Sequence, residues 1–219
     1  TWASHARIEK VARERLHMET LLRHAVERDE LFLQFQPCVD AATLKTIGVE
    51  ALVRWRHPER GLIPPDRFIP IADESGLIVD IGEWVLRQSC RQAKGWHDQG
   101  YADLSVSVNV SAVQFAQPRL LDTVNRALAD AGLQPQALTL EITESVIMHD
   151  AESAVGMLRA LKHMGVRISI DDFGTGYSSL SYLKRFPFDT IKIDRTFVRG
   201  TGVGDRRVIL RSIIDLAHD

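Results

Sequence analysis

Cysteine is scarce in this sequence, since only Cys38 and Cys90 occur among its 219 residues. The two do not form a CxxC pair, and they cannot supply the several disulfides that staple small secreted domains. The sequence therefore favours a reduced, intracellular protein, and we expect this chain to be cytoplasmic.

Long apolar segments are missing as well. No run approaches the roughly 18 residues that a membrane-spanning helix requires, and the first residues show no signal peptide. We therefore expect no membrane contact by this chain itself. The chain opens at Thr1 with a charged helical pattern, which is typical of a fragment of a longer protein. A membrane anchor elsewhere in the parent protein stays open.

A surplus of charge of one sign is also absent. The chain has 27 lysines and arginines and 29 aspartates and glutamates, which gives a formal net charge of -2. A DNA or RNA polymer requires a basic face on its partner, so we expect no such polymer to bind. The eight histidines show no metal-ligand spacing.

What the chain does contain is a regular alternation of periodic segments, in which a period of two predicts strands and a period of 3.6 predicts helices. Strands and helices alternate after the first two strands, which predicts parallel strands wrapped by helices. The link after Cys38 has roughly six residues, too few for a parallel crossover, so the first two strands are expected to pair antiparallel. The predicted strands are 31–37, 44–55, 104–110, 138–143, 166–171 and 190–194, and the predicted helices are 5–30, 77–96, 119–131, 150–164, 178–185 and 205–217. In the first helix, Leu16, Leu21 and Leu22 are among the residues expected on one apolar face.

Each predicted strand has one apolar face and one short polar face. Parallel strands that are covered on both faces usually read as unbroken apolar runs, so the polar faces here are expected to look toward one another. A closed α/β barrel achieves this, and such barrels carry their chemistry at the carboxyl ends of the strands. The polar faces consist of Glu50 and Arg54, then Ser105, Ser107 and Asn109, then Thr139, Glu141 and Thr143, then Ser169 and Asp171, and finally Thr190, Lys192 and Asp194.

Four carboxylates and one amide oxygen fall late in or directly after these strands. Oxygen ligands suit hard divalent cations such as Mg²⁺ or Mn²⁺, and the absence of histidine from the set counts against zinc. Two adjacent aspartates should point to opposite faces of a strand, and they could bridge or flank two ions about 3.5–4 Å apart, as in two-metal hydrolytic sites. A lysine nearby could orient the attacking water or meet the charge that develops at phosphorus. The acidic ring consists of Glu50, Asn109, Glu141, Asp171 and Asp172, and the lysine is Lys192.

Other interpretations of the same residues stay open. An inward carboxylate can simply be the partner of a lysine or arginine, and Lys192 with Glu141 could be a buried ion pair. Lys192 could also form a Schiff base with a carbonyl substrate. The glycine-rich stretch 174–179 lacks the lysine and the spacing of a nucleotide-triphosphate loop, which favours a structural or interfacial loop.

Five short motifs follow one another along the chain, namely EALVRW (50–55), NVS (109–111), EITES (141–145), DDFGTGYSSL (171–180) and KID (192–194). In this order and spacing they resemble the EAL-type cyclic di-GMP phosphodiesterases of bacterial second-messenger signalling. The resemblance implies that residues 21–219 form the EAL domain and that residues 1–20 are a linker helix from a preceding domain, in a parent protein that could be anchored in the inner membrane.

The resemblance also implies a fold and a reaction. The fold is α/β, a modified TIM-like (βα)8 barrel with an antiparallel first strand, and the reaction is hydrolysis of cyclic di-GMP to the linear dinucleotide pGpG with two Mg²⁺ or Mn²⁺ ions. A first ion would be held at Glu50, Asn109, Glu141 and Asp171, and a second at Asp171 and Asp172.

Further roles are implied by the same resemblance. The catalytic positions are Lys192, Asp172, Asp194 and Glu144, of which Glu144 steadies the loop 173–180. The positions that meet the nucleotide are Gln36, Leu52 and Arg54.

Three expectations concern the whole protein. A homodimer is expected through the segment 173–185. The family continues beyond the position of Asp219 with two more strands, which carry a further metal-side glutamate and are absent from this sequence. A catalytically silent cyclic di-GMP receptor of the same fold is the alternative function, although the acidic ring is intact at every position that the chain covers, which favours the enzyme.

Overall fold

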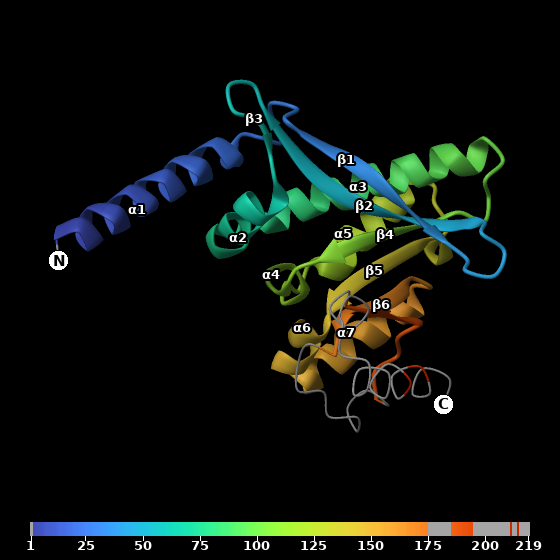
Figure 1. The fold of residues 1–219 in the computed structure, drawn as a ribbon. Helices are drawn as coiled ribbons and strands as arrows, with labels where there is room; N and C mark the ends of the chain where they lie inside the picture. The colour runs from blue at the N-terminus through green and yellow to red at the C-terminus, as the bar shows by residue number, and fades with distance from the viewer. Residues whose placement is uncertain (1, 175–184, 195–210, 212–213, 215–219) are drawn as a thin grey trace. The chain divides into compact units, whose positions relative to one another are not determined.

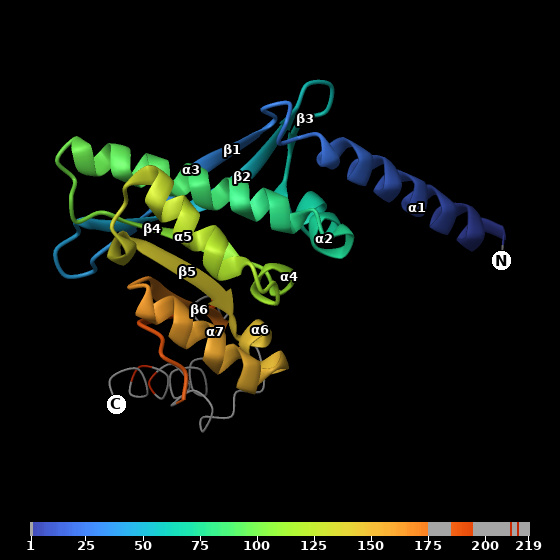
Figure 2. The ribbon, with the colours of Figure 1, turned by 180° about the vertical axis from the view of Figure 1, so that it is seen from behind.

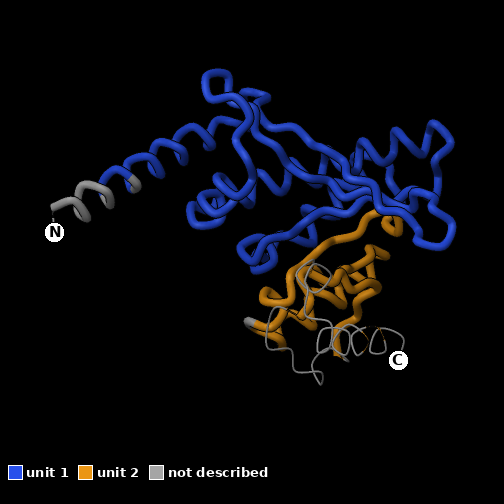
Figure 3. The backbone as a smooth tube through the Cα atoms, in the orientation of Figure 1, with its two compact units in different colours: residues 1–134 blue, residues 135–219 orange. Residues whose placement is uncertain are grey.

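The computed structural model describes residues 2–174, 185–194, 211 and 214. The chain divides into two compact units, Thr1–Gln134 and Pro135–Asp219, which have different colours in Figure 3. Each unit combines helices and strands.

The helices and strands of both units are labelled in Figure 1. Those of the first unit are α1 (Trp2–Arg23), β1 (Leu31–Val39), β2 (Thr46–His57), β3 (Gly61–Ile63), α2 (Pro65–Ser75), α3 (Ile78–Asp98), β4 (Ser105–Val110), α4 (Ala112–Phe115) and α5 (Leu120–Ala131). Those of the second unit are the 3-10 turn η1 (Pro135–Ala137), β5 (Leu138–Thr143), α6 (Glu144–His149), α7 (Ala151–His163), β6 (Arg167–Phe173) and β7 (Thr190–Ile193).

β1 and β2 form the antiparallel hairpin that the short link between them predicted. Their register places Leu31 opposite Trp55 and Gln36 opposite Glu50. β2 also pairs in parallel with β4, with Glu50 opposite Ser107, and its last residues pair with β3. The prediction of an antiparallel first strand is therefore confirmed, and β2 is the strand that joins the sheet of this unit together.

The apolar side chains of β4 are buried while its polar ones are not. Val106, Val108 and Val110 are at most 3% exposed, and the residues between them are half-buried or exposed. Figure 2 shows α3 and α5 lying alongside each other over the strands of this unit. On α3, Leu86 and Cys90 are fully buried. Burial raises the pKa of the Cys90 thiol to about 12, so this cysteine is a neutral core residue.

Trp55, at the end of the EALVRW motif, is the centre of a buried cluster in the first unit. Its side chain has no exposed surface, and its indole Nε1 donates a hydrogen bond to Glu30 Oε2 over 2.9 Å. The ring of Phe68 from α2 meets it edge-on, with the ring centroids 5.7 Å apart. The cluster thus ties α2 and the residue before β1 to the end of β2.

α1 differs from the helix predicted over 5–30. It ends at Arg23, and turns cover the residues that follow up to residue 29. Leu16 is 66% exposed, whereas Met18 and Leu22 are buried. The prediction that Leu16 belongs to a buried apolar face is therefore wrong, because Leu16 precedes the buried Met18 by two residues and so lies on the opposite side of the helix.

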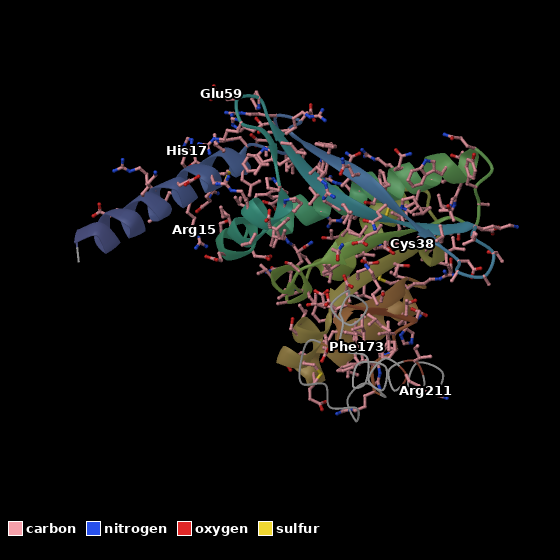
Figure 4. The ribbon with its side chains drawn as sticks, in the orientation of Figure 1. Arg15, His17, Cys38, Glu59, Phe173 and Arg211 are labelled. Atoms are coloured by element: carbon pink, nitrogen blue, oxygen red, sulfur yellow. The ribbon has the colours of Figure 1, made fainter. Side chains whose placement is uncertain are left out.

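Two ion pairs join α1 to α2. Arg15, labelled in Figure 4, pairs with Glu74. The second pair has the opposite polarity, since Glu14 Oε1 accepts from Arg67 at 2.9 Å. All four side chains are substantially exposed, and exposed pairs of this kind contribute about 0–1 kcal/mol each.

In the second unit, β5, β6 and β7 are parallel neighbours. Glu141 of β5 lies opposite Ser169 of β6, and Thr143 lies opposite Asp171. β7 pairs with β6, and α7 buries Leu158 and Leu161 completely. The strands predicted for this region are confirmed. The helices predicted over 178–185 and 205–217 fall almost wholly outside the described residues.

No helix in the described parts of the chain combines the length and the apolar character that crossing a bilayer needs.

Replacement of Trp55 tests the buried cluster. Trp55→Phe keeps an aromatic ring but removes the donor to Glu30, which is 8% exposed. We expect the free energy of unfolding to fall by about 2–3 kcal/mol, since a buried acceptor loses its partner and the ring shrinks. Urea denaturation followed by circular dichroism measures the change.

Tyr101→Phe is the matched control, because Tyr101 is 63% exposed and its hydroxyl can bond to water. A loss of stability in Trp55→Phe no larger than that of the control would contradict the role given to the cluster.

Candidate active site

Glu50 and Asn109 come together in the first unit because their strands, β2 and β4, are parallel neighbours. The Asn109 amide nitrogen donates to Glu50 Oε1 over 2.8 Å. Glu50 is half-buried and Asn109 is exposed. With its NH2 group turned to Glu50, the asparagine keeps its side-chain oxygen as an acceptor. The two residues thus offer carboxylate and amide oxygens side by side, as the metal-site prediction requires of them.

The three residues expected to meet the nucleotide share a face of the β1–β2 hairpin. Gln36 lies directly opposite Glu50. Leu52 and Arg54 follow Glu50 at intervals of two residues, so their side chains leave β2 on the same side as that of Glu50. Gln36 is exposed, and Leu52 and Arg54 are half-buried. The pairing of the hairpin therefore gathers these predicted side chains on one surface.

A lysine and two carboxylates form the polar centre of the second unit. Lys192 Nζ donates to Glu141 Oε2 over 2.6 Å and lies 3.5 Å from Asp171 Oδ2. The Glu141 side chain is 3% exposed, compared with 30% for Lys192. Burial strengthens the attraction between opposite charges, so Lys192 is the counter-charge that keeps a carboxylate inside this unit.

The two adjacent aspartates do not continue the regular alternation of β6. The pairing of β6 with β7 shifts between Ile170 and Phe173, and Asp172 has a φ of +52°. Left-handed backbone is uncommon outside glycine but is enriched in aspartate. The Asp172 amide donates to Asp171 Oδ1 over 2.9 Å. The prediction that both residues follow the simple alternation of a strand is therefore wrong at Asp172, where the strand bulges.

Negative charge is concentrated around Asp172. Burial raises the pKa of the Asp172 carboxyl, and the charges of Asp171 and Asp194 together with a hydrogen bond to Asp194 raise it further. The positive charge of Lys192 acts in the opposite direction. Asp172 and Asp194 are thus neighbours in this centre, as their predicted common role requires.

Glu144 lies at the junction between β5 and α6. It is the first residue of α6 and is 3% exposed. Its Oε2 accepts a hydrogen bond from the backbone N–H of Gly174 over 2.9 Å. This bond holds the chain where it leaves β6, at the start of the loop 173–180 that Glu144 is expected to steady. Most of that loop lies outside the described residues.

The donor chemistry fits a hard divalent cation. The predicted ligands offer only carboxylate and amide oxygens, the ligands that Mg²⁺ and Mn²⁺ prefer. Burial raises the pKa of the Asp172 carboxyl, and the charges of Asp171 and Asp194 raise it further; a cation would offset these charges. Among the described residues, no three His, Cys, Asp or Glu side chains are grouped to hold a metal ion. In the polar centre of the second unit, Lys192 bonds to the carboxylates.

Sequence reasoning missed Gln34, which lies on the same face of the β1–β2 hairpin as Gln36 and Arg54. Its side chain accepts a hydrogen bond from Arg54 Nε over 2.7 Å. The signal was present in the sequence, because Gln34 precedes Gln36 by two residues and so shares its face.

Comparisons with known proteins agree on one family. The model of the EAL domain matches residues 19–219. MucR of Pseudomonas aeruginosa, named as a bifunctional diguanylate cyclase and cyclic di-GMP phosphodiesterase, is 54% identical over 187 residues, which cover 85% of this chain and 27% of MucR. NbdA of the same species, named as a cyclic di-GMP phosphodiesterase, is 43% identical over 94% of this chain and 27% of its own length. The chain thus spans about a quarter of these curated relatives.

Solved structures give the same result for the fold. The MucR phosphodiesterase in complex with c-di-GMP is 50% identical, with a TM-score of 0.88 over 94% of this chain and 82% of that chain. The EAL enzyme Bd1971 in its cGMP-bound form is 32% identical, with a TM-score of 0.89 over 97% of this chain and 59% of that chain. The predicted fold class, α/β and TIM-like with an antiparallel first strand, is confirmed.

Removal of the lysine tests the charge balance of the second unit. In Lys192→Met, the nearly buried Glu141 loses its counter-charge, and we expect the unfolding free energy of this unit to fall by about 2–3 kcal/mol without added metal. All four tryptophans lie in the first unit. Tryptophan fluorescence in urea therefore reports on the first unit alone. Circular dichroism reports on the helices and strands of both units, so a loss seen only by circular dichroism belongs to the second unit.

Lys162→Met is the matched control. Lys162 is 31% exposed, much like Lys192, but its partner Asp189 is 33% exposed, and we expect a loss of only about 1 kcal/mol. Equal losses in the two variants would refute the special role of Lys192.

Proposed function

Because this chain belongs to the EAL domain family, we propose that it hydrolyses one phosphodiester bond of cyclic di-GMP and releases the linear dinucleotide pGpG. Water adds to the phosphorus atom, the bond from phosphorus to one ribose oxygen breaks, and that oxygen takes up a proton. The observation that carries the proposal is the polar centre of Lys192, Glu141 and Asp171. The names of MucR and NbdA, both cyclic di-GMP phosphodiesterases, support the choice of substrate.

The proposal includes two divalent cations, Mg²⁺ or Mn²⁺. Glu50, Asn109, Glu141 and Asp171 would hold one ion, and Asp171 with Asp172 would hold the other. Such ions, when bound, activate water and stabilise negative charge at phosphorus. Support comes from the oxygen-only donor set and from the carboxylates around Asp172, whose pKa is raised first by burial and then by the charges of Asp171 and Asp194.

The remaining polar residues have roles that do not involve binding a metal. Lys192 supplies a cation that orients the attacking water or meets the charge on the phosphoryl oxygens. Asp194 lies beside Asp172, and its charge acts on that carboxyl. Glu144 anchors Gly174 and thereby fixes the backbone that follows Asp172.

Substrate contacts are proposed on the hairpin face. Gln36 and Arg54 would hydrogen-bond to the nucleotide, and Leu52 would pack against it. The MucR phosphodiesterase, whose structure is described as a c-di-GMP complex, supports a nucleotide ligand for this fold. The nearly neutral charge of the chain gives no support to a nucleic-acid polymer as ligand.

The setting of the reaction is also a proposal. We assign residues 1–20 to a linker from a preceding domain, and residues 21–219 to the catalytic domain of a bacterial signalling protein acting in the cytoplasm. Pairing of two copies through the segment 173–185 is proposed because aromatic and leucine residues follow the glycine turn there.

A direct assay tests the activity. The full chain, incubated with cyclic di-GMP and Mg²⁺ or Mn²⁺, is expected to yield pGpG on chromatography. Calcium alone should block turnover, because its longer and looser oxygen shell misplaces the water. Binding of cyclic di-GMP without any product would make the chain a receptor. Full activity in calcium would contradict the proposed metal chemistry, and metal-independent trapping of a carbonyl substrate by borohydride would indicate a Schiff-base lysine.

Replacement of Glu50 tests the ligand set. Glu50→Ala should lower kcat by about 10²-fold or more, because a metal-ligand oxygen is lost. Glu59→Ala is the control, since Glu59 is exposed beyond the end of β2. Parent-like hydrolysis by purified Glu50→Ala would show that Glu50 does not bind the metal.

A further inference from the structure

We propose that Gln34 is a positioning residue that fixes the guanidinium of Arg54 for recognition of a substrate phosphate. The inference rests on the proposed function of this chain, because it assigns Arg54 to the nucleotide. It adds a residue of β1 that contacts Arg54 and acts through it.

The register of the hairpin brings the two side chains together. Gln34 lies opposite Leu52, and Phe32 lies opposite Arg54. Gln34 and Arg54 are therefore diagonal neighbours on one face of the antiparallel pair, within reach of long side chains. This is the face that carries Gln36, the other proposed hydrogen-bonding contact of the nucleotide.

Two hydrogen bonds hold the guanidinium. Arg54 Nε donates to Gln34 Oε1 over 2.7 Å, and Arg54 Nη1 donates to the backbone oxygen of Val53 over 2.9 Å. An arginine has five N–H donors in a rigid planar fork. Donors on both Nη1 and Nη2 are therefore left over from these two bonds, and together they form the edge that grips a phosphate with two parallel hydrogen bonds.

The aromatic ring of Phe32, which lies opposite Arg54, contacts a different arginine, Arg56. The guanidinium carbon of Arg56 lies 4.7 Å from the centroid of Phe32, as in a cation–π contact. Gln34 is the side-chain partner that the structure gives Arg54. The orientation of Arg54 therefore depends on Gln34 and on the backbone of its own strand.

The choice of an amide is chemically specific. A carboxylate in place of Gln34 would accept the same hydrogen bond more strongly, but its charge would offset the positive charge that attracts a phosphate. The neutral amide fixes the orientation and leaves the charge of Arg54 for the ligand. Since Gln34 is exposed, its bond contributes little to folding, and its effect should be felt in substrate affinity.

Two variants of the full chain separate orientation from charge. Gln34→Met keeps the length of the side chain without the acceptor, and Gln34→Glu keeps the acceptor but adds a negative charge. Gln99→Met is the matched control, because Gln99 is exposed at the end of α3. KM and kcat are measured with cyclic di-GMP and Mg²⁺, and the dissociation constant of cyclic di-GMP is measured by calorimetry with Ca²⁺.

We expect KM and the dissociation constant to rise about 3- to 10-fold in Gln34→Met, with kcat within about twofold of the parent value. Gln34→Glu should weaken binding at least as much, by about 10-fold, and its affinity should depend less on salt concentration. Gln99→Met should behave like the parent protein.

The outcomes separate the inference from the proposed function. Parent-like binding by Gln34→Met, an equal loss in Gln99→Met, or a loss confined to kcat would overturn the inference while leaving the proposed function intact. Parent-like binding by Gln34→Glu would overturn the argument from charge. Failure of the unsubstituted chain to bind cyclic di-GMP would overturn both. Thermal unfolding at the parent temperature in all variants shows that the losses are not losses of fold.

Discussion

The alternation of side chains across each strand is the constraint on which the rest of this structure depends. Successive residues of a strand point to opposite faces, so each strand can bury valine or isoleucine on one face while it presents carboxylates or amides on the other. In β4 the buried valines and the polar Asn109 are products of the same alternation. Parallel registers then set polar residues of neighbouring strands side by side, as with Glu50 and Asn109.

Electrostatics decides how far the polar faces can be filled. Glu141 is almost completely buried and stays in place because Lys192 bonds to it. Asp171 and Asp172 lie in the same polar centre, where burial and then the charge of Asp171 raise the pKa of Asp172. A fold with fewer carboxylates at this place would be more stable. The crowding of carboxylates around a single lysine is typical of a functional site whose charge is balanced by a ligand.

Much of this could be predicted from the sequence, because strand alternation and short motifs are local signals. The hairpin followed from a link too short for a crossover. Asn109, Glu141 and the two adjacent aspartates fell in the later halves of their strands as predicted, whereas the prediction was wrong for Glu50, the fifth of the twelve residues of β2. The region of α2 was not predicted, since Pro70 lies inside the helix and interrupts the usual helical pattern. The left-handed backbone of Asp172 could not be derived either, because it depends on how β6 meets β7. The exposure of Leu16 reflects which side of α1 is buried, since Met18 and Leu22 of the same helix are buried.

The reversed direction of β1 has a mechanical consequence. The chain enters β1 at Leu31, which pairs with Trp55 near the end of β2, and the preceding residue, Glu30, bonds to the indole of Trp55. In an all-parallel arrangement, the entering chain would arrive at the start of the strand, far from the residues that follow the motif. Here the chain that follows α1 reaches the sheet at Trp55, the residue next to Arg54 in β2. A displacement at the end of α1 would therefore act first on the part of β2 that carries the arginine proposed to meet the nucleotide.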